Sequence, residues 1–133
     1  MVAMKKQTKY KLDTGDYFLR ALGIANDDGS IKPKMHKKFK QIGRFVELLS
    51  ERIVQAGISN QAKVKVLDIG SGKGYLTFAI HDYLRHSLSN EAQVTGVELR
   101  QNLADLCNKA ALEHKGLGFV CGDVKTHAPK QTD

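Results

Sequence analysis

The chain has 133 residues, of which 41% are hydrophobic and 26% charged, enough for one globular domain of ordinary size. It holds no apolar run near the roughly 18 to 20 residues of a membrane-spanning helix, and its first residues lack a signal-peptide core, so we expect a cytoplasmic protein without a membrane partner. Its cysteines, Cys107 and Cys121, form no CxxC pair or Cys/His cluster at zinc-ligand spacing, which predicts reduced thiols and no metal site.

Positive charge is concentrated in the N-terminal half. Residues 1–65 contain 14 Lys and Arg against 6 Asp and Glu, whereas residues 66–133 contain 7 against 8. Lysine and arginine neutralise phosphates and release counterions, so this imbalance fits RNA or another polyanion. A well-solvated surface without such a partner explains it equally well, and the charge alone leaves both interpretations open.

Two helices are expected in this basic segment. A short one covers residues 16–22 and closes at Gly23. A long one runs from Lys34 to about Ala56, with apolar residues at steps of 3 and 4 that predict a stripe docked on a sheet. Its outward cations Lys37, Lys38 and Lys40 are candidate contacts for RNA. Gly43 costs about 1 kcal/mol relative to alanine in mid-helix, which suggests a close packing contact there.

A buried strand then runs into a glycine turn. Val64, Val66, Leu67 and Ile69 form a β-branched, apolar run typical of a central parallel strand covered on both faces. The glycines at positions 70, 72 and 74 permit positive φ and the close approach of a ligand. A helix from about Tyr75 to residue 86 or 88 follows, with its N-terminus at the turn.

Three kinds of glycine loop compete at this point. A phosphate-binding loop needs Ser or Thr after the lysine, but Lys73 is followed by Gly74. A dinucleotide fingerprint needs glycine at position 75, where Tyr75 stands, and this argues against a nicotinamide-dependent oxidoreductase. The remaining pattern is an acid, Asp68, two residues before the first of three alternating glycines.

Two further strands are predicted, and an acid closes each. Residues 93–99 read as a strand that contains Glu98, and residues 117–122 as a strand followed by Asp123. Between them, residues 101–114 predict a crossover helix with Leu106 and Cys107 on its inner face. In a parallel βαβ unit the end of the second strand lies beside the glycine turn, where a carboxylate can accept hydrogen bonds from both ribose hydroxyls.

The stretch from Asp68 to Thr77 resembles motif I of the Rossmann-like S-adenosylmethionine-dependent methyltransferases. Together with Lys37 to Ile42 and Val94 to Arg100, it is similar to methyltransferase-domain proteins of largely unassigned substrate. A similar basic helix and Gly-Lys-Gly sequence also occur in a family that methylates a tRNA 2′-oxygen. The resemblance covers about residues 17–124. It implies an α/β Rossmann-like parallel sheet and an S-adenosylmethionine cofactor.

The resemblance also implies a role for each residue of the expected site. The turn would hold the methionine and ribose part of the cofactor, with Asp68 ordering the loop and Glu98 accepting the ribose hydroxyls. Leu99 would pack on the adenine, and Asp123 and the Val124 amide would bond its edge. The cofactor-binding positions are Asp68, Gly70, Ser71, Gly72, Gly74, Glu98, Leu99, Asp123 and Val124. No general base is assigned.

The family's domain carries about seven strands, whereas the pattern here predicts three. We therefore expect a basic helical extension at residues 1–60 and part of an S-adenosylmethionine-binding domain at residues 61–133. The leading function is methyl transfer, with RNA as acceptor. The alternative is an inactive S-adenosylmethionine-binding fragment that acts as a binding or pairing module, because the first strand leaves an open sheet edge for self-association.

Overall fold

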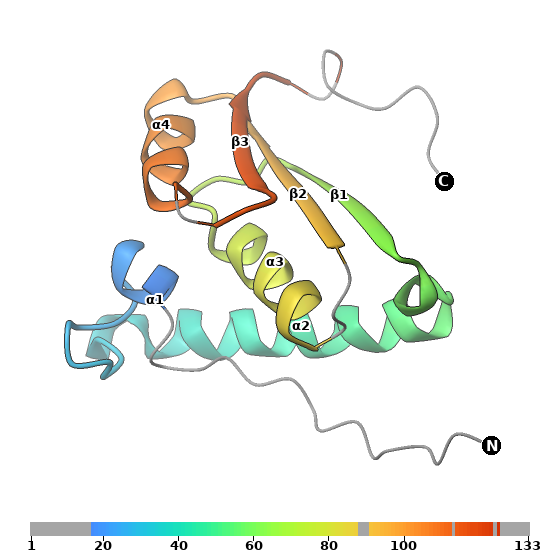
Figure 1. The fold of residues 1–133 in the computed structure, drawn as a ribbon. Helices are drawn as coiled ribbons and strands as arrows, with labels where there is room; N and C mark the ends of the chain where they lie inside the picture. The colour runs from blue at the N-terminus through green and yellow to red at the C-terminus, as the bar shows by residue number, and fades with distance from the viewer. Residues whose placement is uncertain (1–16, 88–90, 113, 124, 126–133) are drawn as a thin grey trace.

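A computed structural model describes residues 17–87, 91–112, 114–123 and 125 of the chain. In this part, three parallel strands alternate with helices (Figure 1). The elements in chain order are α1 (Tyr17–Ala21), the 3-10 turn η1 (Pro33–Met35), α2 (His36–Gln55), the 3-10 turn η2 (Ile58–Asn60), β1 (Lys63–Ile69), α3 (Tyr75–Ser87), β2 (Glu91–Glu98), α4 (Gln101–Ala110) and β3 (Leu117–Cys121).

The sheet has the strand order β1-β2-β3, so β2 is central and β1 lies at an edge. In the parallel register, Asp68 lies opposite Gly96 and Glu98 opposite Cys121. The prediction that β1 is a central strand covered on both faces was therefore wrong. Among the described residues β1 pairs only with β2, and Ile69 at its end is 42% exposed. An apolar, β-branched run indicates a strand but not its place in the sheet.

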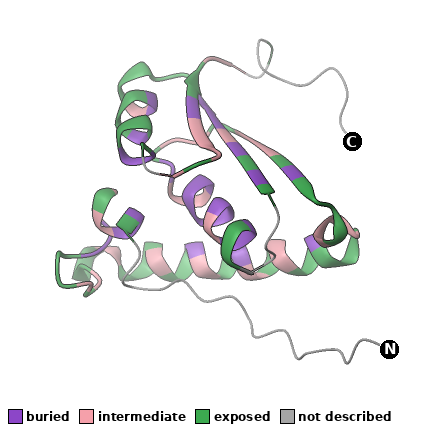
Figure 2. Ribbon diagram, viewed as in Figure 1, coloured by how far each residue is buried: buried purple, intermediate pink, exposed green. Residues whose placement is uncertain are grey.

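The core lies between the sheet and the helices on one of its faces. Phe78 of α3 stacks on Phe18 of α1 and on Phe119 of β3, with ring centroids 5.6 Å apart in both pairs. All three rings are buried, and Figure 2 shows α3 as buried along most of its length. Because the rings come from three elements, α1 belongs to the same core as the sheet.

The long helix α2 packs mainly against α3 and not directly on the sheet, as its position along α3 in Figure 1 shows. Its stripe is confirmed, with Ile42, Val46 and Ile53 buried. The expectation that it docks on the sheet was wrong, because α3 lies between them. The packing contact expected at Gly43 is also absent, since a Cβ built there meets no described atom within 4 Å.

Helix α4 ends at Ala110, earlier than expected, and crosses β3 and β2. Cys107 is buried as predicted, but Leu106 is 51% exposed and Ala104 occupies the inner face in its place. Asn108 fixes the helix to β3: its side chain accepts from the N–H of Phe119 and donates to the same residue's carbonyl. Polar side chains paired in this way set helix position as firmly as apolar packing.

The arrangement is an α/β fold with an open parallel sheet, as expected from the alternation of elements. In the described part of the chain, no helix has both the length and the apolar character needed to cross a membrane.

Candidate functional site

The glycine turn after β1 has the predicted backbone conformation. Gly70, Gly72 and Gly74 have φ values of 75°, 58° and 81°, which side chains other than glycine rarely adopt. The N–H groups of Gly70 and Ser71 both donate to the carbonyl of Val97, at 2.7 and 3.0 Å. The turn is thereby fixed to the end of β2. A Cβ at Gly70 would meet open space, so the backbone is accessible there.

Asp68, the acid before the turn, is half-buried. Its Oδ2 accepts a 2.7 Å hydrogen bond from the hydroxyl of Thr77, which is fully buried on α3. The bond joins the end of β1 to the first turn of α3 across the glycine turn. No role was assigned to Thr77 from the sequence, because its bond to Asp68 depends on the shape of the turn between them.

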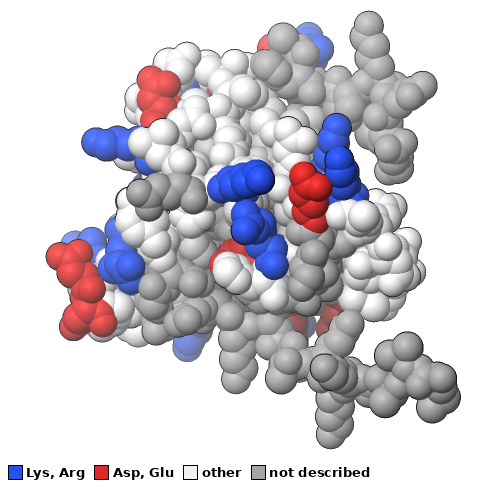
Figure 3. All heavy atoms as spheres, viewed as in Figure 1, with Lys and Arg blue, Asp and Glu red and all other residues white. Residues whose placement is uncertain are grey.

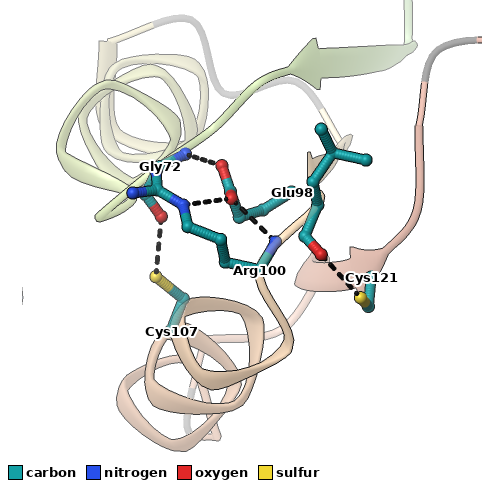
Figure 4. Close-up of polar contacts among 6 residues, drawn as sticks. Gly72, Glu98, Arg100, Cys107 and Cys121 are labelled. Carbon is teal, nitrogen blue, oxygen red and sulfur yellow. Dashed lines mark hydrogen bonds and ion pairs between the residues drawn. The ribbon is translucent and has the colours of Figure 1, made fainter.

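Glu98 ends β2 with its carboxylate almost fully enclosed, at 6% side-chain exposure. Oε1 accepts from the N–H of Gly72 at 3.0 Å, while Oε2 accepts from the N–H of Arg100 at 2.9 Å and from its Nε at 2.8 Å (Figure 4). These hydrogen bonds lower the pKa of Glu98 to about 2, and the bonds from Arg100 make the largest contribution. The carboxylate is therefore ionised at neutral pH and points at the turn.

Arg100 was not assigned a role from the sequence. Its side chain is 64% exposed and its guanidinium reaches back over Glu98, towards Gly72 (Figure 4). A carboxylate offers about four acceptor positions, of which the protein here fills three. One acceptor position is therefore open. If two hydroxyls donated to Glu98 at the same time, one of them would compete with Arg100 Nε for Oε2.

The two thiols lie on either side of this carboxylate (Figure 4). Cys107 is buried with Sγ 3.8 Å from the Gly72 carbonyl, and burial raises its pKa to about 11. Cys121 is exposed, and its Sγ donates to the carbonyl of Leu99 at 3.3 Å. Both cysteines are free, as predicted. Leu99 itself is 70% exposed beside Cys121.

The third acid, Asp123, follows a residue that is hydrogen-bonded to the backbone of Glu98. The N–H of Gly122 donates to the carbonyl of Glu98 at 3.0 Å, so Asp123 directly follows a residue bonded to the end of β2. Asp123 is half-buried and has partners of its own. The expected amide contact at Val124 lies outside the described residues. The sheet thus brings the ends of β1, β2 and β3 to one edge, as parallel strands require.

A second feature borders the glycine turn on its α2 side. A cavity of about 360 Å³ lies between them, lined by Lys38, Gln41, Ile42, Phe45, Ser71, Lys73, Tyr75 and Leu76. The ammonium of Lys38 lies 5.9 Å from the centre of the Tyr75 ring. Lys37 and Lys40 are exposed nearby on α2 and do not line the cavity. Among the described residues, no cluster of three His, Cys, Asp or Glu could hold a metal ion.

An open parallel sheet with a glycine turn after its first strand and an acid at the end of its second defines an α/β protein of the kind in which ligands bind at the carboxyl ends of the strands. The chain matches the family model of a methyltransferase domain over residues 37–133 and belongs to that family. No curated protein sequence matches the chain.

Two solved structures of one protein share the fold. A mutant of MtNAS in complex with S-adenosylmethionine is 19% identical, with a TM-score of 0.56 over 88% of this chain and 43% of that one. A second structure of the MtNAS mutant is 22% identical, with a TM-score of 0.51 over 80% of this chain and 38% of that one. A weaker likeness is to the plantazolicin methyltransferase BpumL in complex with a monoazolic desmethylPZN analog and SAH, which is 21% identical, with a TM-score of 0.45 over 75% of this chain and 38% of that one. The chain spans less than half the length of these proteins.

Proposed function

We propose that this chain binds S-adenosylmethionine at the ends of β1, β2 and β3 and forms the methyl-donor part of a methyltransferase. The observation that carries the proposal is the ionised carboxylate of Glu98, which the Gly72 N–H holds against a bare glycine turn. An anionic acceptor beside exposed backbone suits the paired hydroxyls of a ribose. Family membership and the S-adenosylmethionine complex of a protein with the same fold support the same cofactor.

The residues present fit the cofactor in two further respects. The Ser71 hydroxyl is buried and has no hydrogen-bond partner among the described residues, so a polar ligand group at the turn could satisfy it. Gly70 presents accessible backbone, where a side chain would occupy ligand space. Leu99 and Asp123 supply an apolar surface and an acid at the neighbouring strand end. Together they form a complete set of contacts for a nucleoside, with Val124 as a further proposed contact.

The methyl acceptor proposed for this site is RNA. Lys37, Lys38 and Lys40 are exposed on α2, and Lys38 also lines the cavity beside the glycine turn. The bound cofactor would supply a methyl group on a sulfonium, open to in-line attack by an oxygen or nitrogen nucleophile. The chain's own contribution is to hold the methyl donor and the methyl acceptor close together and correctly oriented. Proximity of this kind supplies a large share of the catalytic rate.

A second candidate is a cofactor-binding module without activity of its own. It is favoured by β1, which pairs with one strand among the described residues and so leaves an edge for pairing with another chain. The two free cysteines fit the reducing cytoplasm, where we place the protein in either case.

Incubation with S-adenosylmethionine labelled in the methyl group separates the candidates. Label should enter a total RNA pool and not a protein pool, and the charge reversals Lys37→Glu, Lys38→Glu and Lys40→Glu together should reduce it by about tenfold or more. The reversal Arg52→Glu on the same helix is the control. Binding of the cofactor without transfer to any pool would favour the inactive module, and transfer to protein alone would refute an RNA acceptor.

A further inference from the structure

A cavity of about 680 Å³ lies at the opposite end of the sheet from the glycine turn, where β1 and β2 begin. Its polar lining comes from Lys63, Lys65, Arg85, Glu91, Gln93 and Lys115. Four cations therefore surround one carboxylate. In Figure 3, blue side chains gather at the centre of this face and over β1, with a red group beside them. We refer to this hollow and its lining residues as the basic hollow.

Among the described residues, none of the four cations forms an ion pair, and Glu91 is the one carboxylate in the lining. Elsewhere in the described residues, arginines form ion pairs: Arg44 with Glu47 and Arg100 with Glu98. No carboxylate of the described part of the chain lies within ion-pair distance of the cations of the basic hollow. An unneutralised group of like charges destabilises the folded protein unless an anion binds there, so the arrangement favours an anionic ligand.

One of the cations, Arg85, is also held in position, by the backbone of Lys115. Nη1 of Arg85 donates to the carbonyl of Lys115 at 3.1 Å, and Nε2 of His81 donates to the same carbonyl at 2.9 Å. The next residue, Gly116, has a φ of 87°, and a Cβ there would lie 2.2 Å from the Ala92 carbonyl oxygen. Gly116 therefore leaves room for the close approach of Ala92, and the Lys115 carbonyl is held by its two hydrogen bonds. The Lys115 carbonyl is a neutral acceptor, so it orients Arg85 without neutralising its charge. Because the side chain is already ordered, an anion that binds it costs less conformational entropy.

Lys63 and Lys65 extend the charge along an edge strand. They are two residues apart on β1 and so point to the same side, about 6.6 Å apart along the strand. This separation suits successive phosphates of an extended nucleic-acid strand. The basic hollow is open to solvent, and its lining has no aromatic side chain on which a base could stack. Contacts of this kind recognise a phosphate backbone without reading sequence.

We propose that the basic hollow binds the phosphodiester backbone of a nucleic acid. The surface is distinct from the donor site and from the α2 lysines, and does not require methyl transfer. Its contacts are electrostatic, so the affinity falls steeply with salt, and each lost phosphate contact lowers the salt slope by about 1.

The test is the binding of a labelled single-stranded RNA of about 12 nucleotides to the full chain, measured across salt concentrations. Lys63→Gln with Lys65→Gln should weaken binding by about tenfold at low salt and lower the salt slope by about 2. The matched control removes two exposed cations outside the basic hollow, Arg52→Gln with Lys109→Gln, and should change affinity by less than about twofold. Equal losses in the two double variants would overturn the proposal.

A third variant works in the opposite direction and removes no cation. Glu91→Gln deletes the carboxylate of the basic hollow and should tighten RNA binding by about two- to threefold at low salt. It keeps the test decisive even where the lysine variants fold poorly. Unchanged RNA affinity in Glu91→Gln refutes the proposal. So does binding to vesicles of phosphatidylserine and phosphatidylcholine that depends on the same lysines while RNA binding does not, because this would make the partner a lipid surface.

Discussion

The N–H of Gly72 donates a 3.0 Å hydrogen bond to Oε1 of Glu98, which joins the turn after β1 to the end of β2. The residues are 26 positions apart, and the parallel pairing of the two strands brings them together. The carboxylate is consequently oriented by the protein itself. A ligand that uses it meets a preorganised acceptor, which lowers the free-energy cost of binding.

Removal of the Arg100 side chain should tighten binding of S-adenosylhomocysteine by about two- to fivefold. The guanidinium competes with the ribose for Oε2 of Glu98, and an exposed ion pair of this kind is only modestly stabilising. Calorimetric titration of Arg100→Ala measures the change. Arg44→Ala is the control, because Arg44 is equally exposed and also paired, but on α2. Weaker binding in Arg100→Ala would show that the guanidinium contacts the ligand instead.

The ionisation of Glu98 should be complete across the physiological pH range. Hydrogen bonds from Arg100 depress its folded-state pKa to about 2 from an ordinary value of 4.5. A depressed carboxyl stabilises the folded chain fully above the unfolded value, and this contribution is lost only as the pH falls through the folded value. NMR titration of the side-chain carboxyl should give a midpoint near 2, and a higher one in Arg100→Ala. A midpoint near 4.5 in the unmodified chain would contradict the hydrogen bonds described.

Two glycine-to-alanine substitutions should change stability in opposite directions. Gly43→Ala should stabilise the chain by up to about 1 kcal/mol, because the position is helical and a Cβ meets open space. Gly96→Ala should destabilise it by about 1 to 3 kcal/mol, because its Cβ would lie 2.4 Å from the Phe119 ring. Urea unfolding measures both. A change of the same sign in the two variants would be inconsistent with this packing.

The two cysteines should react differently with iodoacetamide at neutral pH. Cys121 is exposed and should be alkylated, whereas Cys107 is buried, with its pKa raised to about 11, and should remain unmodified in the folded chain. Saturating S-adenosylhomocysteine should slow the alkylation of Cys121, because its Sγ lies against the backbone of Leu99, the proposed adenine contact. Mass spectrometry locates the label. Alkylation of Cys121 at an unchanged rate would argue against an adenine at Leu99.

The local patterns predicted most of the fold. Alternating glycines predicted positive φ at the turn, and the structure confirms it at Gly70, Gly72 and Gly74. The apolar run alone did not reveal that β1 lies at an edge, since such a run has the same periodicity in an edge strand as in a central one. The open edge was expected only from the number of strands predicted. The exposure of Leu106 has a similar origin, because helical periodicity does not reveal how much of a helix its neighbours cover.

In the candidate site too, residues with a local sequence signal were predicted, and residues whose partners depend on the fold were not. Glu98 was found because an acid at the end of a strand is a local signal. Its partner Arg100 was not, because the pairing depends on the chain's turn from β2 into α4, which places the guanidinium back over the carboxylate. Thr77 was missed for the same reason, since its bond to Asp68 crosses a turn whose shape had to be known first.

The most direct test of the donor site is the titration of S-adenosylhomocysteine into the folded chain and into two variants of β2. Glu98→Gln removes the carboxylate at the turn, and Glu91→Gln removes one at the far end of the same strand. The account predicts saturable binding to the unmodified chain and to Glu91→Gln, and affinity at least about tenfold weaker in Glu98→Gln. No saturable binding to the unmodified chain, or equal affinity in the two variants, would contradict it.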